Sequence, residues 1–266
     1  MSKVAIVTGG SSGIGLAFAR AWVDRGGHVA LVARTPKTLG EAVATLGGAP
    51  QARAYPLDVQ DVAALAALPA RVRSDLGRVD VVVNNAGLNH RGSVARYSPT
   101  DLAAVIATNL TAPIVLTRAS LEVVERGGAI VQVASVAGMI PVPGEATYSA
   151  SKAGLRAFAR AVAADEAAAH VHVGCVSPGP VDTGFLGDLG EVPDIVLSQP
   201  MVSADEVARA ILRCIDERLP EVVIPARSGA LATFGYLLPS VATRIRPLLE
   251  RRGAKHRREI LARRKR

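Results

Sequence analysis

The chain has 266 residues and a mass of 27.5 kDa, which is enough to bury a sizeable core within one domain. Its formal net charge of +8 is concentrated at one end, because residues 244–266 hold eleven Lys and Arg against two Glu, a net of +9, and leave −1 for the first 243 residues. With aromatic residues at only 3% and no basic stripe before the tail, the body of the chain gives little support to nucleic-acid binding.

Cysteine and histidine usage also narrows the class of protein. Cys175 and Cys214 lie in apolar stretches without ligand-like spacing, so we expect reduced core cysteines in a cytoplasmic protein. No metal site is expected, because no metal-binding spacing links the histidines, which are His28, His90, His170, His172 and His256. The first apolar run is short and leads straight into a glycine-rich turn, so no signal peptide is predicted.

The first predicted elements are a buried strand at Val4–Val7 and a helix marked by Leu16, Ala19 and Val23. Between them lies the turn Thr8-Gly9-Gly10-Ser11-Ser12-Gly13-Ile14-Gly15. In this context small residues let the backbone approach a pyrophosphate, and free N–H groups at the helix N-terminus meet its charge. The spacing differs from the common Gly-x-Gly-x-x-Gly fingerprint, and alone the turn could be no more than a tight connection.

Strand-like apolar runs and amphipathic helical segments then alternate along the chain. The predicted strands are 4–7, 28–33, 53–57, 79–83, 129–134, 171–176 and 221–224, and the predicted helices lie near 13–25, 36–46, 60–76, 99–125, 146–168 and 203–217. With right-handed crossovers this predicts an α/β fold, a doubly wound parallel sheet with its ligand at the carboxyl ends of the strands. Residues 1–227 would form this domain, and residues 228–266 a C-terminal extension that is not an independent domain.

The helix predicted near 146–168 carries Tyr148 and Lys152, four residues apart. This spacing places both side chains on one face, where the ammonium favours the phenolate and lowers the pKa of the tyrosine. Such a pair is a proton donor that can be tuned toward neutral pH. By itself the pair could equally belong to a solvated helix face.

The whole set of motifs resembles the short-chain dehydrogenase/reductase family, of its single-domain type, over roughly residues 3–225. The motifs are Thr8 to Gly15, Asp58-Val59, Asn84-Asn85-Ala86-Gly87, Asn109, Ser135, Tyr148 with Lys152, and Pro178-Gly179 followed by Thr183. The resemblance implies a Rossmann-like three-layer α/β/α fold. It also implies an oxidoreductase that transfers a hydride between a nicotinamide cofactor and a carbonyl/secondary alcohol pair, and that assembles as a homodimer or homotetramer.

By this resemblance four residues are catalytic. Tyr148 is the proton donor to a ketone, or the base acting on an alcohol, and Lys152 lowers its pKa and binds the nicotinamide ribose. Ser135 ends a strand and holds the substrate oxygen, while Asn109 anchors a water that links Lys152 to solvent. Each of the last two also has a structural alternative, since Ser135 could cap a strand end and Asn109 could satisfy backbone groups at a helix kink.

The resemblance also implies a cofactor-binding set, namely Gly9, Ser11, Ser12, Gly13, Ile14, Gly15, Arg34, Asp58, Val59, Asn85, Ala86, Gly87, Tyr148, Lys152, Pro178, Gly179, Val181 and Thr183. An acidic residue at the end of the second strand would bind the adenine ribose 2′-hydroxyl and repel a 2′-phosphate, but Ala33 stands there. Arg34 follows and suits a phosphate, although it could be a solvated turn residue. The sequence therefore favours NADP(H), with an NAD(H)-dependent alcohol dehydrogenase of the same family as the alternative.

The expected substrate walls are apolar. Segment Gly184–Val202 lies where the family keeps a mobile lid, and Asn89 to Arg91 and Met139 to Gly144 would form the other walls. A hydrophobic ketone or secondary alcohol, such as one with a lipid-like chain, fits such walls. Apolar lining is nevertheless common to small-molecule sites in general.

The C-terminal extension departs from the minimal family pattern. Residues 228–243 carry no charge, but Pro239 interrupts them and they fall short of the ~20 residues of a spanning helix. With the basic tail they predict either peripheral contact with an anionic membrane, or packing against the pocket or a second subunit followed by a frayed soluble tail. Two further alternatives are a cofactor-binding regulator with little turnover and a surface-binding protein that acts through its tail.

Overall fold

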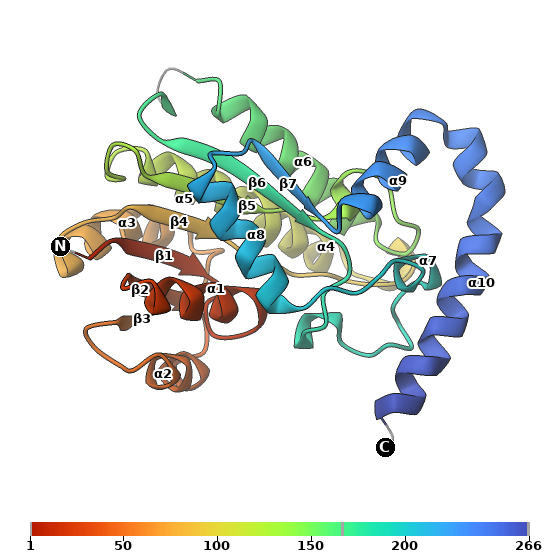
Figure 1. Ribbon diagram of the computed structural model, residues 1–266, viewed down its shortest axis with the longest axis horizontal. Coiled ribbons are helices and arrows are strands. Elements are labelled where there is room, and N and C mark those ends of the chain that lie inside the picture. Colours follow the sequence, from red (N-terminus) through yellow and green to blue (C-terminus); the bar gives the residue numbers. More distant parts are fainter. Residues whose placement is uncertain (1, 166–167, 265–266) are drawn as a thin grey trace.

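Within residues 2–165 and 168–264, the part of the chain that the structure describes, seven strands form one parallel sheet. In this computed structural model the strands are β1 Val4–Thr8, β2 His28–Ala33, β3 Ala52–Pro56, β4 Val81–Asn84, β5 Ala129–Val133, β6 His172–Pro178 and β7 Glu221–Ile224. Their order is β3-β2-β1-β4-β5-β6-β7 (Figure 1). The order reverses between β1 and β4, so the carboxyl ends of these strands flank the crevice where ligands bind in doubly wound sheets.

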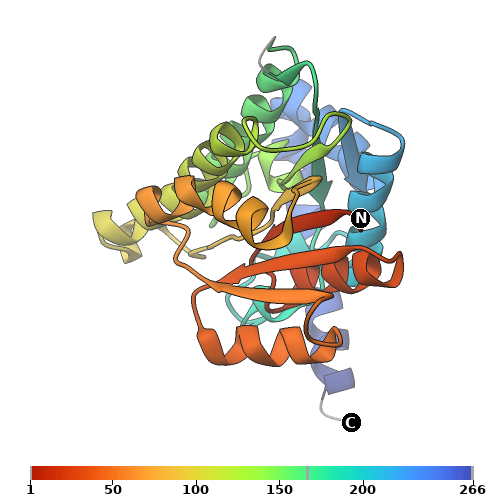
Figure 2. The same cartoon turned by 90° about the vertical axis from the view of Figure 1, so that its left-hand side faces the viewer.

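Helices cover both faces of the sheet (Figure 2). The α-helices are α1 Gly13–Asp24, α2 Pro36–Thr45, α3 Val62–Leu76, α4 Pro99–Ile106, α5 Ala112–Ser120, α6 Ala146–Val162, α7 Asp194–Leu197, α8 Ala204–Asp216, α9 Ala226–Leu237 and α10 Pro239–Arg264. Short 3-10 turns are η1 Val94–Arg96, η3 Val136–Gly138 and η5 Gly184–Leu186, and η2 Ala107–Thr111 is a π-helical turn.

Two apolar clusters fill the space between the sheet and its helices. β1 contributes to both, because successive side chains of a strand point to opposite faces. Ala5 and Val7 join the cluster built with α1 and α8, while Val4 and Ile6 join the cluster built with α3 and α5. Burial on both faces explains why the strands read as continuous apolar runs. The predicted doubly wound α/β fold is thereby confirmed.

The long helix predicted over 99–125 is interrupted and ends early. α4 stops at Ile106, the π-helical turn η2 follows, and α5 ends at Ser120. A π-turn inserts one extra residue into the helix and is often found at functional sites. Here it turns Asn109 fully inward, so that the side chain has no exposed surface.

By length and composition alone, one helical stretch among the described residues could cross a membrane, Pro99–Ser120, with a mean hydropathy of 1.5. Within it, Val105 and Leu116 are fully buried, and Leu116 packs in the cluster beside α3 and the sheet. Buried core helices of globular domains pass the same test, so this stretch is weak evidence of a membrane span.

The basic C-terminal tail is helical rather than frayed, which corrects that part of the expectation. α9 and α10 form a helical hairpin at the end of the molecule opposite the N-terminus (Figure 1). α10 packs along α7, and Gly253 makes this possible, because a Cβ there would lie 1.7 Å from the carbonyl oxygen of Asp194. One face of α10 therefore packs against the body of the protein.

Candidate active site

A cavity of about 370 Å³ lies at the carboxyl edge of the sheet. Of the predicted catalytic and cofactor-binding residues, those that line it are Gly9, Ser12, Gly13, Ile14, Asn85, Ala86, Gly87, Ser135, Tyr148, Lys152, Pro178, Gly179, Val181 and Thr183. The predicted residues outside this lining are Ser11, Gly15, Arg34, Asp58, Val59 and Asn109. The structure thus brings most of the predicted site together from four strand ends and α6.

The glycine-rich turn forms a cradle that side chains would fill. Gly9 and Gly13 adopt positive φ angles of 64° and 52°, a conformation that favours glycine. A Cβ on Gly15 would lie 2.3 Å from the carbonyl oxygen of Gly9. The turn leads into the N-terminus of α1, so the residues present fit a pyrophosphate held by backbone N–H groups.

Thr8 and Asn85 fasten this turn to the end of β4. The Thr8 hydroxyl accepts hydrogen bonds from the backbone N–H groups of Asn85 at 3.0 Å and Ala86 at 3.1 Å. The Asn85 amide donates to the carbonyl oxygens of Thr8 at 3.0 Å and Gly9 at 3.3 Å. The Asn85 amide nitrogen is thus used to hold the glycine-rich turn in shape. Asn85 also lines the cavity.

Arg34 and Asp58 lie further along the same edge, directly after β2 and β3. Both are exposed, and the Asp58 carboxylate accepts a hydrogen bond from the backbone N–H of Gln60 at 3.0 Å. Val59 is instead buried in the core cluster beside α3. Its side chain is therefore a packing residue, which leaves only its backbone available to a cofactor.

Tyr148 and Lys152 share one face of α6, as their spacing predicts. The Lys152 ammonium lies 5.8 Å from the centroid of the Tyr148 ring and donates to the carbonyl oxygen of Val133 at 2.8 Å. Ser135 follows β5 and makes a side-chain hydrogen bond with Tyr148. The Ser135 hydroxyl also accepts from the backbone N–H of Ala137 at 3.1 Å, so the capping role weighed as its alternative exists beside the contact with tyrosine.

The pKa of Tyr148 is raised in this structure, contrary to the expectation that Lys152 lowers it. Burial of the hydroxyl is the main cause and the Glu145 carboxylate adds to it, while the hydrogen bond from Ser135 and the charge of Arg91 oppose them. Burial also lowers the pKa of Lys152 to about 8. Because the pKa of Lys152 lies well below the raised pKa of Tyr148, the lysine has lost its charge before the tyrosine ionises, and at lower pH its ammonium points at a backbone carbonyl.

Asn109 holds two parts of the site together. Its amide oxygen accepts from the backbone N–H of Leu88 at 2.7 Å, and its amide nitrogen donates to the carbonyl oxygen of Leu88 at 2.8 Å and to the Ser151 hydroxyl at 3.0 Å. Ser151 immediately precedes Lys152 on α6. Asn109 therefore fixes the loop after β4 against the catalytic helix, and its role with a water molecule remains a prediction.

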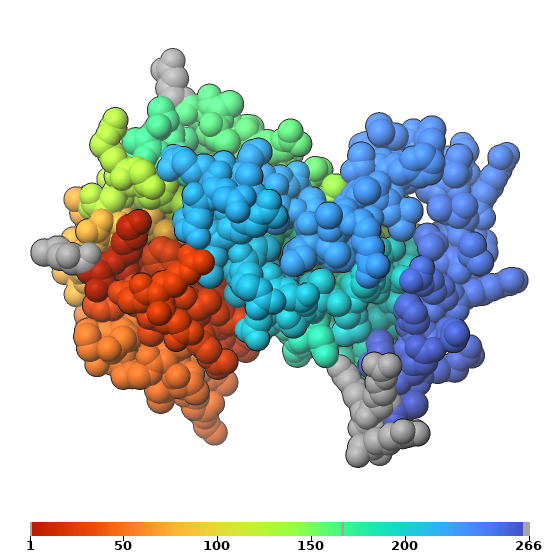
Figure 3. All heavy atoms as spheres, in the orientation of Figure 1, coloured from red at the N-terminus to blue at the C-terminus, as the bar shows by residue number. Residues whose placement is uncertain are grey.

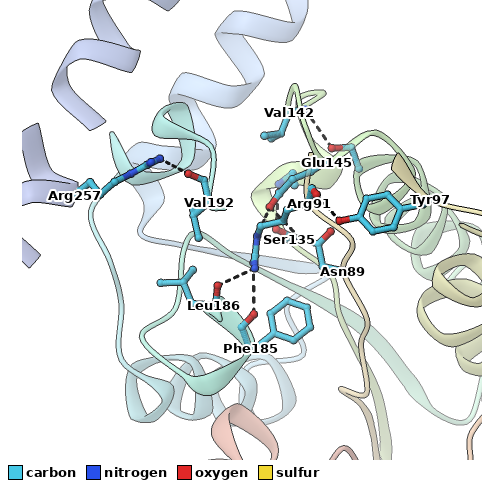
Figure 4. A network of polar contacts seen from close by, with 12 residues as sticks. Asn89, Arg91, Tyr97, Ser135, Val142, Glu145, Phe185, Leu186, Val192 and Arg257 are labelled. Carbon is cyan, nitrogen blue, oxygen red and sulfur yellow. Dashed lines mark hydrogen bonds and ion pairs between the residues drawn. The ribbon is translucent and has the colours of Figure 1, made fainter. Parts of the chain in front are cut away.

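A buried ion pair that the sequence did not reveal joins Arg91 and Glu145, as Figure 4 shows, and both of its charges act on Tyr148. The Glu145 carboxylate accepts from Arg91 Nε at 2.9 Å and from Asn89 Nδ2 at 2.9 Å, and the side chains of Arg91 and Glu145 are only 11% and 5% exposed. Asn89 and Arg91 were expected in the substrate wall, whereas Glu145 was not singled out. The one feature of the sequence that could have indicated Glu145 is its position about one helical turn before Tyr148.

The predicted lid is held from both sides. Arg91 donates to the carbonyl oxygen of Leu186 at 2.8 Å, and on the far side Arg257 of α10 pairs with Asp194 at 2.9 Å and donates to the carbonyl oxygen of Val192. Between these contacts an apolar cluster packs against α10, and its members are Leu186, Leu189, Val192, Leu197, Val196, Met201 and Ile260. The segment is thus an ordered wall of the cavity in this structure.

The inner wall of the cavity is mostly apolar. Phe185 lies with its ring centroid 6.1 Å from that of Tyr148. Further apolar side chains come from η3 and the loop after it, from α7, and from both C-terminal helices, namely Ile140, Val142, Ile195, Val196, Leu231, Ala232 and Leu249. The alternative expectation, that the C-terminal extension packs against the pocket, is therefore confirmed for the parts of α9 and α10 that line the cavity.

The family of this chain follows from comparison with known proteins. The model of the short chain dehydrogenase family matches residues 3–193, so the chain belongs to this family, whose members are oxidoreductases of carbonyl and alcohol groups. Among curated relatives, the ketoacyl reductase HetN of Nostoc is 34% identical over 231 residues, which cover 84% of this chain and 78% of HetN. The 3-oxoacyl-[acyl-carrier-protein] reductase of Bos taurus is 37% identical over 193 residues, which cover 72% of this chain and 81% of that protein.

Solved structures agree with this assignment. A short chain dehydrogenase from Burkholderia cenocepacia, solved in complex with NADP, has a TM-score of 0.76 and 30% identity and covers 84% of this chain and 96% of its own. One from Streptomyces avermitilis has a TM-score of 0.78 and 30% identity, with coverage of 93% and 96%. The first of these is in line with the NADP(H) cofactor that the sequence favours.

Proposed function

We propose that the protein is an NADP(H)-dependent ketoreductase that acts on a hydrophobic, lipid-like ketone or the matching secondary alcohol. The observation that carries this proposal is the meeting of Ser135, Tyr148 and Lys152 in one cavity, between the glycine cradle and an apolar wall. An intact set of this kind argues against the alternative of a cofactor-binding regulator with little turnover.

The cofactor would be held along the carboxyl edge of the sheet. The glycine cradle and the N-terminus of α1 suit its pyrophosphate, Val181 and Thr183 are proposed for the carboxamide, and Lys152 for the ribose. Arg34 is proposed for the 2′-phosphate, supported by its exposure and by Ala33 in the place of an acidic residue. When bound, the nicotinamide supplies the hydride.

The protein's own residues supply the proton. Ser135 and Tyr148 are proposed to hold the ketone oxygen by hydrogen bonds, and Tyr148 donates its proton as negative charge develops on that oxygen. Because the pKa of Tyr148 is raised, the hydroxyl stays protonated at neutral pH and is ready to act as the acid in reduction. Lys152, with a pKa of about 8, can pass a proton to the tyrosine near physiological pH.

A hydrophobic ketone is favoured over a polar one by the charge balance of the wall. The Arg91 guanidinium lies 6.0 Å from the centre of the Phe185 ring, but each of its three nitrogens already donates, to Glu145 and to the carbonyl oxygens of Phe185 and Leu186. An anionic substrate group would have to break this pair. The names of the ketoacyl and 3-oxoacyl reductases among the relatives support the same substrate class.

The experiment that tests the proposal is a steady-state screen of ketones of graded chain length with NADPH and NADH. We expect turnover with NADPH, and a kcat/KM that rises with chain length as more apolar surface is buried, by about 0.8 kcal/mol for each buried CH₂ group. Turnover only with NADH would favour the NAD(H)-dependent alternative. Absence of turnover with every ketone and alcohol would favour the alternative of a cofactor-binding regulator.

Assembly and location are part of the proposal. We propose a cytoplasmic homodimer or homotetramer, because members of the family commonly form oligomers. We also propose that residues 228–266 reach a membrane surface. The exposed apolar side chains of α9, such as Tyr236 at 65% and Leu237 at 69% exposure, support that contact.

A further inference from the structure

We infer that the outer surface of the α9–α10 hairpin docks onto an anionic lipid bilayer, and that a ketone dissolved in that bilayer reaches the cavity past this hairpin. The docking is inferred from the residues of the hairpin and does not depend on the proposed function. The delivery of the ketone rests on the proposed function.

The tip of the hairpin exposes large apolar side chains. Within the eighteen residues from 231 to 248, those at least 36% exposed are Leu231, Phe234, Tyr236, Leu237, Leu238, Val241 and Leu248. They belong to the end of α9 and the first turns of α10, on the part of the molecule that stands out as a ridge at the right of Figure 3. A contiguous stretch of exposed apolar residues on a soluble domain marks an interaction surface.

Cations line the outer face of α10. Arg244, Arg251, Lys255 and Arg258 are all exposed and repeat at spacings of seven, four and three residues, which keeps them on one side of a helix. The side packed against the body follows its own series of the same kind, Ala242, Leu249, Gly253, His256 and Ile260. Among the described residues, no ion pair within 4.0 Å engages Arg244, Arg251 or Arg258.

Apolar side chains beside a cationic face whose three arginines have no ion pair among the described residues suit an anionic bilayer better than a second copy of this chain. In a two-fold dimer through this surface, each helix would bring its arginines toward those of its partner, which is unfavourable. Anionic headgroups would instead neutralise the arginines, while the tip of the hairpin enters the interface. This commits the surface to lipid and leaves self-association as an outcome that the experiment can reveal.

The hairpin is also part of the substrate cavity. Leu231 and Ala232 of α9 and Leu249 of α10 line the cavity, and Leu231 is 36% exposed. Leu231 therefore belongs both to the apolar wall of the cavity and to the exposed apolar set of the hairpin. A bilayer on the hairpin would lie next to the wall that receives the hydrophobic part of the substrate.

Vesicle flotation tests the docking. The full-length protein is mixed with vesicles of phosphatidylcholine, with or without phosphatidylglycerol, at low and at high salt. We expect binding only with phosphatidylglycerol, weakened by salt. The variant Arg244→Gln/Arg251→Gln/Arg258→Gln should bind on the order of 10²-fold more weakly, whereas the matched control Lys3→Gln/Arg71→Gln/Arg126→Gln, with three exposed cations elsewhere, should bind normally.

A second variant, Tyr236→Ser/Leu237→Ser/Leu248→Ser, tests the apolar part, and these positions are exposed enough that folding should not depend on them. We expect it to lose vesicle binding while remaining as folded as the wild type by circular dichroism. The docking inference is overturned if the wild-type protein does not bind phosphatidylglycerol vesicles at low salt, or if the triple variant of α10 and its matched control bind equally well. It is also overturned if the serine variant only dissociates a dimer in sedimentation velocity and still binds vesicles.

Delivery is tested with two substrates. Turnover of a water-soluble short-chain ketone should be the same in wild type and in both docking variants, while turnover of a long-chain ketone held in phosphatidylglycerol vesicles should fall in the variants alone. Equal turnover of the vesicle-held ketone by all proteins would contradict delivery. Absence of turnover even with soluble ketones would mean that the proposed function fails, and vesicle flotation would still decide the docking.

Discussion

At the scale of single residues, the site depends on how burial sets the charge of Tyr148 and Lys152. Burial opposes ionisation of both groups, so the tyrosine stays protonated and the lysine has a pKa of about 8. The spacing of four residues predicted their shared face correctly but not the sign of the pKa shift on the tyrosine. That sign depends on burial and on Glu145, which local spacing does not report.

The first prediction concerns Tyr148→Phe. This variant removes only the hydroxyl, so we expect kcat for ketone reduction to fall by about 10²–10⁴-fold while the affinity for cofactor stays near normal. Stopped-flow turnover and fluorescence titration of the cofactor measure the two effects. A kcat within twofold of the wild type would rule out Tyr148 as the acid.

The second prediction concerns Glu145→Gln. The carboxylate raises the pKa of Tyr148, and its removal frees the charge of Arg91, which lowers that pKa, so both effects act in one direction. The other polar groups that face the tyrosine, Ser135 and Lys152, are unchanged. Reduction needs the protonated tyrosine, so above the step that Lys152 sets at a pKa of about 8, we expect the further loss of kcat to begin at lower pH in the variant than in the wild type.

A matched control for this shift is Glu122→Gln, which removes an exposed carboxylate just after α5 that pairs with Arg118, and it should leave the profile unchanged. Thermal melting of both variants shows whether each is folded at the temperature of the assay. A profile for Glu145→Gln that coincides with the wild type would mean that Glu145 only shapes the lid.

The third prediction concerns Arg34→Ala. If the guanidinium faces the 2′-phosphate, the variant should lose affinity for NADPH by roughly 10-fold or more, as expected for a charge-assisted contact of about 1.5–3 kcal/mol, and should keep its affinity for NADH. Fluorescence titration with both cofactors checks this. Equal losses for NADPH and NADH would make Arg34 a structural residue.

At the scale of elements, apolar periodicity was enough to place the strands. Each of the seven predicted strands begins and ends within two residues of its observed counterpart, because strands buried on both faces leave continuous apolar runs. The π-turn at Ala107–Thr111 and the helix at Pro239–Arg264 were not predicted. In α10 the basic residues obscured an inner face that only the contact with α7 makes evident.

The pairs that hold the lid could not be predicted either. Arg91 meets Glu145 from 54 residues away, and Arg257 meets Asp194 from another element altogether. Sequence order gives no register for such contacts, whereas the motif residues at strand ends are brought together by the parallel sheet itself. The meeting of the motif residues at one edge of the sheet was therefore predictable, and the contacts of Arg91 and Arg257 with the segment after β6 were not.

The fourth prediction belongs to this scale and concerns Arg257→Gln. Loss of the contacts with Asp194 and Val192 should loosen the lid from α10, lower the free energy of unfolding by about 1–3 kcal/mol, and speed proteolysis within residues 184–197. Urea unfolding and limited proteolysis measure these effects. The neighbouring Arg252→Gln, at an exposed position, is the control and should change neither; equal behaviour of the two variants would mean that Arg257 does not hold the lid.

At the scale of the whole molecule, the protein combines a family core with a C-terminal hairpin that completes the cavity. The core provides the glycine cradle, Ser135, Tyr148 and Lys152, and the hairpin adds Leu231, Ala232 and Leu249 to the apolar part of the wall. The charge of the chain follows the same division, because the tail holds a net of +9 and the rest is nearly neutral. The arrangement is that of an oxidoreductase whose largely apolar cavity is lined in part by its C-terminal extension, which also carries most of its net charge.

The most direct test of this account is the oxidation of NADPH by the purified full-length protein with ketones of increasing chain length, run in parallel with NADH. The account predicts turnover that prefers NADPH, a kcat/KM that increases with the length of the apolar chain, and loss of that turnover in Tyr148→Phe. Absence of turnover with every ketone and alcohol under both cofactors, in protein that binds NADPH and is folded, would contradict it.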